Sequence, residues 1–164
     1  MSDTAPLVLA RARVRPEWID FNGHMTASAY VVAFDEAVFS LLGRIGVDPA
    51  YRTEAKCSTF ALELHVTYQR ELPADAPYTL HGRILAADAK KVHFWHELRH
   101  AEEGWLSATQ EVVNLHVDLT TRRAARFPGH IAGKIDALMA GDAARPYPEV
   151  AGSSVGLSRR RPAT

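Results

Sequence analysis

The sequence contains little of what several special classes of protein require. Only one of its 164 residues is a cysteine, Cys57, so no disulfide can form within the chain. The 19 basic and 19 acidic side chains cancel, which leaves no net charge to attract nucleic acid or an anionic membrane. No apolar run approaches the roughly 20 residues that a membrane-spanning helix needs. These absences argue against a disulfide scaffold, a nucleic-acid binder and a membrane protein.

The two ends of the chain differ from its centre. The stretch MSDTAPLVLARAR lacks the basic start and long apolar segment of a secretory signal, which favours a cytoplasmic protein. The composition is 47% hydrophobic and 23% charged, as in a globular domain with its own core. We place that single domain at residues 1–140. Residues 141–164 have no apolar repeat and carry an arginine run at 159–161, so we expect a mobile C-terminal tail.

Hydrophobic periodicity predicts one strand, one long helix and then four strands. Alternation over residues 7–15 indicates a strand that ends before Pro16. Apolar residues recur every three or four positions from Tyr30 to Ile45, which predicts a helix of about five turns that Gly46 and Pro49 end. A period of two then predicts strands, and a final helix follows; the ranges are 57–69, 78–87, 91–100 and 105–117 for the strands and 127–139 for the helix.

The most informative motif is Asp20-Phe21-Asn22-Gly23-His24-Met25, at the expected start of the long helix. Asp, Asn and Gly are common turn formers, so an ordinary strand-to-helix turn also explains the motif. The first helix amides, from about Met25 to Ser28, lack partners within the helix and lie at the positive end of its dipole. They would stabilise negative charge on a carbonyl oxygen. The motif therefore predicts an acid, Asp20, beside an anion-stabilising helix end.

Glu63 and His65 form a second candidate pair, on the strand at 57–69. Alternation puts both on one face, about 7 Å apart at roughly 3.3 Å per residue, so both can face one cleft. There they would orient a water molecule or recognise a substrate. The alternative is that they are solvent-facing residues of a half-exposed strand.

Three further histidines, His93, His96 and His100, suggest a metal site at first sight. On a strand His96 and His100 would lie about 13 Å apart, too far to share a zinc ion bound at about 2 Å. We therefore expect no metal. These histidines are predicted to pair across strands or to fill a face of the sheet.

Several motifs together resemble a known family. They are Asp20–Met25 followed by Tyr30, Glu63-Leu64-His65, Lys91-Val92-His93-Phe94-Trp95-His96, and Leu115-His116-Val117-Asp118. From about Val14 to Phe127 the chain resembles the acyl-CoA thioesterases of the 4-hydroxybenzoyl-CoA thioesterase-like superfamily. Within it, the motifs are most similar to the betainyl-CoA thioesterase branch associated with carnitine degradation.

The resemblance implies a fold and an assembly. The fold is the α+β hotdog fold, in which an antiparallel sheet of about five strands wraps a long central helix. Relatives form dimers whose sheets join edge to edge, with the sites at the subunit interface. We therefore expect a homo-oligomer, either a dimer or a tetramer.

The resemblance also implies roles for residues. Asp20 would act on the thioester as base or nucleophile, and we add His24 and Glu63 as catalytic candidates. The predicted substrate-binding residues are Asn22, Gly23, Met25, Tyr30, His65, Lys90 and Lys91. An aromatic wall of Phe21, Tyr30, Phe34 and Trp95 would suit a trimethylammonium group. Tyr30 and Phe34 fit the core stripe of the helix equally well, and core is the favoured role for Phe34.

Coenzyme A carries phosphates, which need basic partners. The candidates are Arg70, Lys90, Lys91, Arg99, Arg122 and Arg123. Lys90 and Lys91 are preferred, because a hairpin tip can present two amines to a phosphate without burying them. No cofactor is expected apart from the CoA part of the substrate.

The expected activity is hydrolysis of a small acyl-CoA, with betainyl-CoA favoured. One alternative is an enoyl-CoA hydratase of the same fold. Its D-x-N-P-[LIV]-H pattern differs from this motif, because His24 comes one residue early and the proline is missing. The other alternative is a non-catalytic acyl-CoA-binding module, which would tolerate the loss of Asp20.

Overall fold

The structure, a computed structural model, describes residues 7–153 and 155. Within these residues the elements are, in chain order, β1 (Val8–Arg13), η1 (Pro16–Trp18), α1 (Ala27–Ile45), α2 (Pro49–Ala55), β2 (Cys57–Tyr68), β3 (Pro77–Ala87), β4 (Lys91–His100), β5 (Leu106–Asp118), β6 (Arg123–Ala124) and α3 (Gly129–Gly141). The predicted strands and both predicted helices are present, with bounds that differ by a few residues. None of the described helices is long and apolar enough to cross a bilayer.

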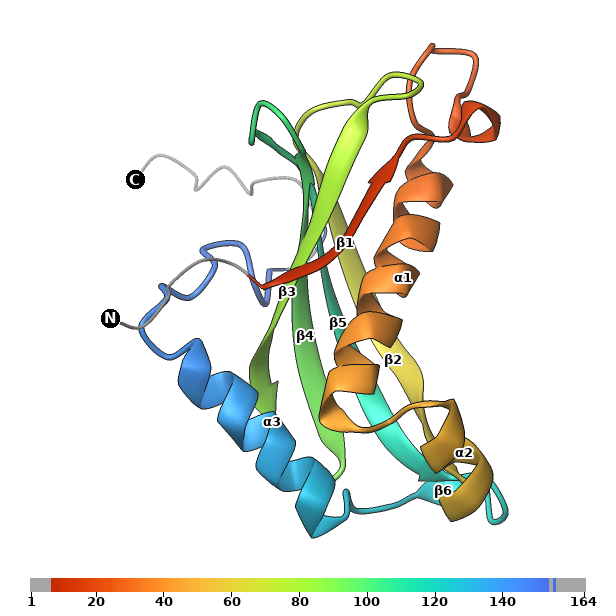
Figure 1. Ribbon diagram of the computed structural model, residues 1–164, viewed down its shortest axis with the longest axis vertical. Coiled ribbons are helices and arrows are strands. Elements are labelled where there is room, and N and C mark those ends of the chain that lie inside the picture. Colours follow the sequence, from red (N-terminus) through yellow and green to blue (C-terminus); the bar gives the residue numbers. More distant parts are fainter. Residues whose placement is uncertain (1–6, 154, 156–164) are drawn as a thin grey trace, which may run out of the picture.

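The sheet is antiparallel and has the strand order β1-β3-β4-β5-β2, with β6 paired to the end of β5. It curls around α1, which lies along its concave face (Figure 1). This arrangement is the predicted α+β hotdog fold. The third helix, α3, packs beside α1 and against β3.

Three short elements, η1, α2 and β6, escaped the sequence analysis. They have 3, 7 and 2 residues, too few for a hydrophobic period to appear. Pro49, which was expected to help end the long helix, instead opens α2, where a proline needs no amide partner. The Asp48 side chain caps α2 by accepting the Tyr51 N–H at 2.8 Å.

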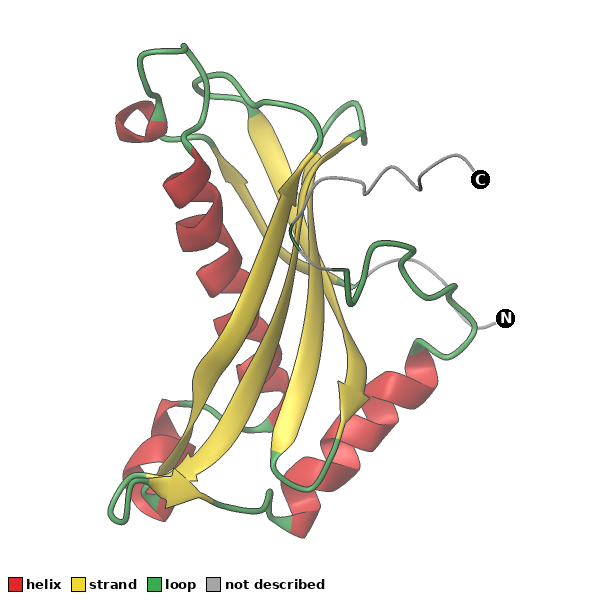
Figure 2. Ribbon diagram, turned by 180° about the vertical axis from the view of Figure 1, so that it is seen from behind, coloured by secondary structure: helices red, strands yellow, loops and turns green. Residues whose placement is uncertain are grey.

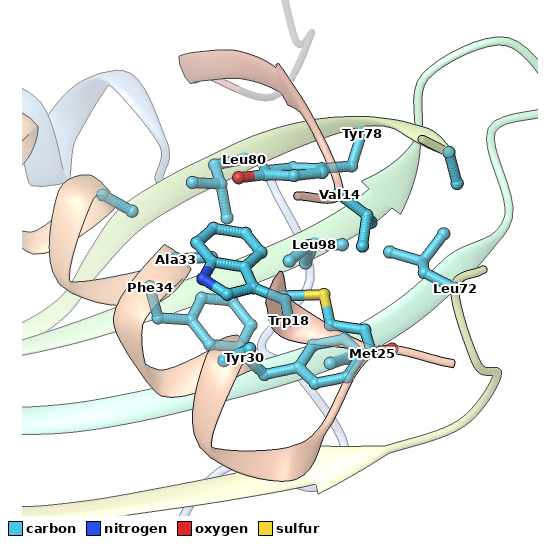
Figure 3. Close-up of a cluster of buried hydrophobic side chains, with 14 residues drawn as sticks. Val14, Trp18, Met25, Tyr30, Ala33, Phe34, Leu72, Tyr78, Leu80 and Leu98 are labelled. Atoms are coloured by element: carbon cyan, nitrogen blue, oxygen red, sulfur yellow. The ribbon is translucent and has the colours of Figure 1, made fainter. Parts of the chain in front are cut away.

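The core lies between α1 and the sheet and consists of two clusters. Trp18, Met25, Tyr30 and Phe34 belong to the cluster at the start of α1, where their side chains point toward one another (Figure 3). The second cluster surrounds the end of α1 and includes residues of α3. The apolar stripe of the long helix is thus buried as predicted, and the helix start is anchored on an aromatic core.

Strand β2 is irregular and forms one edge of the sheet. It pairs with β5 along its length, and a bulge lies between Ala61 and Glu63. Phe60 pairs with Leu115 and Glu63 with Val113, so Phe60 and Glu63 share a face of the sheet. Strict alternation along a strand would put these two residues, three positions apart, on opposite faces. The extra residue in the bulge reverses the order beyond it.

After α3 the chain crosses the convex face of the sheet (Figure 2). The Arg83 guanidinium donates to the carbonyl of Pro146 at 2.5 Å, and the Gly152 N–H donates to the Glu111 carboxylate at 2.9 and 3.0 Å. Residues 142–153 of the predicted tail therefore contact the sheet. The division at residue 140 and the mobility of the tail stay predictions, and the arginine run at 159–161 lies outside the described residues.

Candidate functional site

The Asp20–Met25 motif forms a closed turn directly before α1. Asp20 accepts the Asn22 backbone N–H at 2.8 Å and the Asn22 side-chain amide at 3.3 Å. Gly23 has φ +85°, a left-handed conformation that glycine adopts without strain, and its N–H donates to the Asp20 carbonyl at 3.0 Å. The motif is therefore a turn, as expected, and it holds the Asp20 carboxylate at the start of the helix.

The free amides at this helix start are fewer than the sequence predicted. Met25 N–H donates to the Leu72 carbonyl and Thr26 N–H to the Trp18 carbonyl, both at 2.8 Å. Within the described residues, the amides of Ala27 and Ser28 have no assigned acceptor, and Thr26 makes no side-chain cap. These two N–H groups lie in the first turn of α1 and are the ones left to polarise a carbonyl oxygen.

A cavity of about 350 Å³ opens beside the helix start. Its lining residues are Asp20, His24, Met25, Ala27, Tyr30, Tyr68, Gln69, Arg70 and Glu71. We call it the acid cavity. It brings together four predicted site residues, Asp20, His24, Met25 and Tyr30. An adjoining cavity of about 400 Å³, the outer cavity, is lined by Asn22 and Gly23 and shares His24, Arg70 and Glu71.

Two tyrosines form the aromatic wall of the acid cavity. Tyr30 is buried and its hydroxyl lies 3.2 Å from Ser107 Oγ, which itself donates to the Arg70 carbonyl at 2.6 Å. Burial raises the pKa of Tyr30, so its hydroxyl stays neutral near pH 7. Tyr68 packs edge-on against Tyr30 at 5.3 Å and donates to the Ala27 carbonyl at 3.1 Å. Both rings are thus fixed at the cavity wall.

Glu63 and His65 share a cleft, as predicted, but not with Asp20. They line a cavity of about 170 Å³ together with His93 and Glu111. In register, His65 lies beside Glu111, which lies beside Trp95, on the face of the sheet opposite α1. The Glu111 carboxylate is 3.2 Å from His93 Nε2 and 3.8 Å from His65 Nδ1. We call these four residues the convex-face cluster.

Lys90 and Lys91 also lie away from Asp20 within one chain. Lys91 pairs with Leu115 of β5, whereas Tyr68, at the acid cavity, pairs with Ala108. Seven residues along β5 separate these pairs by roughly 23 Å, at about 3.3 Å per residue. The tight hairpin was predicted correctly, and Asp88 closes it by accepting the backbone N–H groups of both lysines.

The other aromatic and histidine candidates are dispersed. Of the predicted aromatic wall, Tyr30 reaches the acid cavity, while Phe34 is fully buried in the core, its favoured role. Phe21 is 97% exposed, and Trp95 lies on the convex face, where its indole N–H donates to Glu97. Among the described residues no group of three or more histidine, cysteine, aspartate or glutamate side chains is placed to hold a metal ion.

Sequence reasoning missed three lining residues, Tyr68, Gln69 and Glu71, and considered Arg70 only as a basic candidate. All four follow or end β2, about 50 positions after Asp20. Their link to the motif is the tertiary hydrogen bond from Met25 to Leu72. The sequence does place these residues at the end of a predicted strand. It does not show that this end of the strand lies next to the start of the long helix.

Comparison with known proteins gives consistent matches. The family described as the thioesterase-like superfamily matches residues 14–135. A betainyl-CoA thioesterase of Pseudomonas aeruginosa is 34% identical over 144 residues, which are 88% of this chain and 91% of that protein. An L-carnitine dehydrogenase/betainyl-CoA thioesterase of Rhizobium meliloti is 33% identical over 95% of this chain, which spans 31% of that longer protein.

Two solved structures share the architecture. A hypothetical protein from Staphylococcus aureus, solved in complex with CoA, is 27% identical with a TM-score of 0.86, over 93% of this chain and 96% of that one. A putative thioesterase from Pseudomonas putida KT2440 is 29% identical with a TM-score of 0.82, over 94% of this chain and 99% of that one.

Proposed function

The chain belongs to the thioesterase-like superfamily, and from this premise we propose that it hydrolyses betainyl-CoA to betaine and CoA, with Asp20 as the reacting carboxylate. The coarser statement, an acyl-CoA thioesterase, follows from the family and from the relatives. The observation that carries the finer proposal is the acid cavity, where Asp20 lies beside the helix amides and two tyrosine rings.

The reaction needs a nucleophile and a site for negative charge. Asp20 either takes a proton from a water molecule that attacks the thioester carbon or attacks that carbon itself. The Ala27 and Ser28 N–H groups would hold the carbonyl oxygen as it gains negative charge. Collapse of the tetrahedral intermediate breaks the C–S bond, and the CoA thiolate takes a proton. In the direct route water then hydrolyses the acyl-Asp20 anhydride.

The walls of the acid cavity suit a cationic acyl group. Tyr30 and Tyr68 present aromatic rings, and a quaternary ammonium ion is attracted by the faces of such rings. The carboxylates of Asp20 and Glu71 line the same cavity, and their two negative charges outnumber the one positive charge of Arg70 on that lining. Charge and aromatic surface together favour the trimethylammonium of a betainyl group over a neutral acyl group of the same size.

The proposed enzyme is a dimer formed through β2. The edge of β2 that faces away from β5 is paired with no strand in residues 7–153. Leu62 and Leu64 on this strand are 55% and 45% exposed, an apolar edge that proteins normally pair or cover. Antiparallel pairing of β2 with a second copy would give a continuous sheet. The acid cavity borders Tyr68 at the end of β2 and would lie at that interface.

The test of substrate is thiol release from a panel of acyl-CoAs. We expect betainyl-CoA to react fastest and its neutral isostere, tert-butylacetyl-CoA, at least several-fold more slowly. Equal rates for the two would contradict the betainyl assignment alone. No thiol release from any member would overturn the thioesterase proposal. Hydration of an enoyl-CoA without thiol release would favour the hydratase instead.

The test of assembly is sedimentation at micromolar concentration. The chain has a mass of 18.1 kDa, and we expect a species of twice this mass or more. Leu64→Lys places a charge on the unpaired strand and should shift the equilibrium toward monomer. A wild-type protein that sediments as a stable monomer would contradict the shared interface.

A further inference from the structure

Arg70 is held in one position by contacts with both its backbone and its side chain. Its backbone N–H donates to the Ser107 carbonyl at 3.2 Å, and its carbonyl accepts the Ser107 hydroxyl at 2.6 Å. The guanidinium carbon lies 4.2 Å from the centre of the Trp105 ring, a stacked cation–π contact. The Trp105 ring is also stacked with the His100 ring, with the two ring centres 5.0 Å apart. The guanidinium is therefore placed on a rigid platform.

Within residues 7–153 this guanidinium forms no ion pair with an acid at 4.0 Å or less. Glu71 and Glu103 line the outer cavity with it but lie outside that distance. It lines both the acid cavity, with Asp20, and the outer cavity, with His100 and Trp105. Arg70 is exposed, and its guanidinium offers five N–H donors at the junction of two cavities while forming no ion pair in the described residues, which suits it to binding an anion.

The other basic candidates are engaged or distant. Arg99 is paired with Glu97 at 2.8 Å, and Arg122 stacks on Phe60 on the convex face of the sheet. Arg123 pairs in register with Asp118, which is ten residues, or roughly 33 Å, along β5 from the partner of Tyr68. Lys90 and Lys91 lie roughly 23 Å along the sheet from the acid cavity in the same chain, at about 3.3 Å per residue. Arg70 is the basic candidate that shares a cavity with Asp20.

The class of anion follows from the proposed substrate, on which this inference rests. In betainyl-CoA the carboxylate of betaine is consumed in the thioester, and the acyl group carries a positive charge. The negative charges of the substrate are therefore those of the CoA phosphates. Arg70 and Glu71 lie at the junction of the two cavities, whereas Asp20 lines only the acid cavity and Trp105 only the outer cavity. The cationic acyl group would therefore lie on the Asp20 side of Arg70, and the CoA arm on the Trp105 side.

We propose that Arg70, stacked on Trp105, binds a phosphate group of CoA and that the outer cavity receives the CoA arm of the substrate. Arg70 is then a substrate-binding residue, distinct from the reacting carboxylate. It replaces the hairpin lysines as the main phosphate contact contributed by the chain that holds Asp20.

The direct test is calorimetric binding of three ligands, CoA, dephospho-CoA and pantetheine, to the full-length protein. We expect Arg70→Gln to weaken CoA binding by about 10- to 100-fold, the range of a lost charge-assisted hydrogen bond, and to leave pantetheine binding unchanged. The CoA affinity of Arg70→Lys should lie between those of the wild type and Arg70→Gln. Loss of CoA but not of dephospho-CoA affinity assigns the 3′-phosphate, and loss of both assigns the pyrophosphate.

Kinetics give a second readout. With betainyl-CoA, Arg70→Gln should raise KM by about 10-fold or more and change kcat less than twofold; with betainyl-pantetheine it should change neither. The matched control is Arg44→Gln, an exposed arginine near the end of α1, which should leave all affinities unchanged.

Several outcomes would overturn the assignment. They are equal losses for CoA and pantetheine, unchanged CoA binding in Arg70→Gln, and loss of CoA binding in a Lys90→Gln, Lys91→Gln double variant but not in Arg70→Gln. Absence of CoA binding to the wild type would do so too. Because binding is measured without turnover, a failure of the betainyl-CoA proposal remains distinguishable from a failure of the Arg70 assignment.

Discussion

Two clusters of acids and histidines lie on opposite faces of one sheet and differ in what their carboxylates do. In the acid cavity, the Asp20 carboxylate accepts hydrogen bonds from Asn22 and, among the described residues, from no other group, and it lies beside helix amides. In the convex-face cluster, both oxygens of Glu111 accept the Gly152 N–H, and two histidines flank it. The first acid faces a cavity with room for substrate, and the second fastens the chain that follows α3.

The comparison shows that residue types alone do not identify a catalytic site. In the sequence, Glu63-x-His65 and Asp20-x-Asn22-Gly23-His24 are both candidate catalytic motifs. The structure gives only the second a helix start with unpaired amides and an aromatic wall. An acid next to a histidine becomes a candidate catalyst when donors for the developing charge lie beside it.

Asp20→Asn is the most direct test of the different roles of the two carboxylates. Asparagine keeps the turn-forming oxygen that accepts the Asn22 N–H but removes the charge that attacks or takes a proton. We expect turnover of betainyl-CoA to fall by about 10²- to 10⁴-fold, with the free energy of unfolding changed by about 1 kcal/mol or less.

The matched variant on the other face is Glu63→Gln, for which we expect turnover within about twofold of wild type, because it shares no cavity with Asp20 in one chain. His24→Asn should fall between the two. If Asp20→Asn retains more than half of the wild-type turnover, Asp20 is not the reacting carboxylate. If Glu63→Gln loses as much turnover as Asp20→Asn, the convex-face cluster also takes part in catalysis.

Glu111→Gln tests the structural role of the convex-face cluster. The neutral amide is a weaker acceptor for the Gly152 N–H and no longer attracts the histidines. We expect the free energy of unfolding in urea to drop by about 1–3 kcal/mol, while kcat and KM stay within twofold. Glu102→Gln, in an exposed turn, is the control. A larger loss of turnover than of stability would instead point to a functional cluster.

A third test uses pH and a histidine on the concave face. His96 is fully buried, and burial lowers its pKa to about 3, well below an ordinary value of about 6.5. As the pH falls, His96 is therefore protonated in the unfolded chain before it is protonated in the folded protein. The contribution of neutral, buried His96 to the free energy of unfolding is present above about pH 6.5 and is lost between that pH and about pH 3.

Over this window the loss approaches about 1.4 kcal/mol per pH unit. Urea unfolding at pH 7.0 and 5.5 measures it. His96→Leu should flatten the slope, whereas His93→Leu on the convex face should leave the His96 contribution in place. An unchanged slope in His96→Leu would show that other groups dominate the acid sensitivity.

The smallest expected effect concerns substrate preference. Tyr68 is about half exposed, and a cation–π contact at such a site contributes about 0.5–1 kcal/mol. Tyr68→Leu should therefore reduce the preference for betainyl-CoA over tert-butylacetyl-CoA by about two- to fivefold. Tyr68→Phe keeps the ring and should keep the preference. An equal drop for both substrates in Tyr68→Leu would indicate packing rather than recognition of charge.

Local sequence determined most of the fold. The period of three to four from Tyr30 to Ile45, and the period of two afterwards, follow from which residues must face one buried surface. The turn at Asp20–Met25 was equally predictable, because glycine at φ +85° and the Asx hydrogen bond are local effects. These features depend on neighbours a few residues apart, so the sequence alone determines them.

The composition of the site was decided by the tertiary structure. Tyr68, Arg70 and Glu71 reach Asp20 because the end of β2 returns to the helix start, where Met25 bonds Leu72. The bulge between Ala61 and Glu63 reverses which residues of β2 face each side of the sheet beyond it. The chain that follows α3 donates the Gly152 N–H to the Glu111 carboxylate. Each depends on contacts between residues more than 40 positions apart. Periodicity can say that a side chain leaves the sheet on one face, but only the packed chain fixes what it meets there.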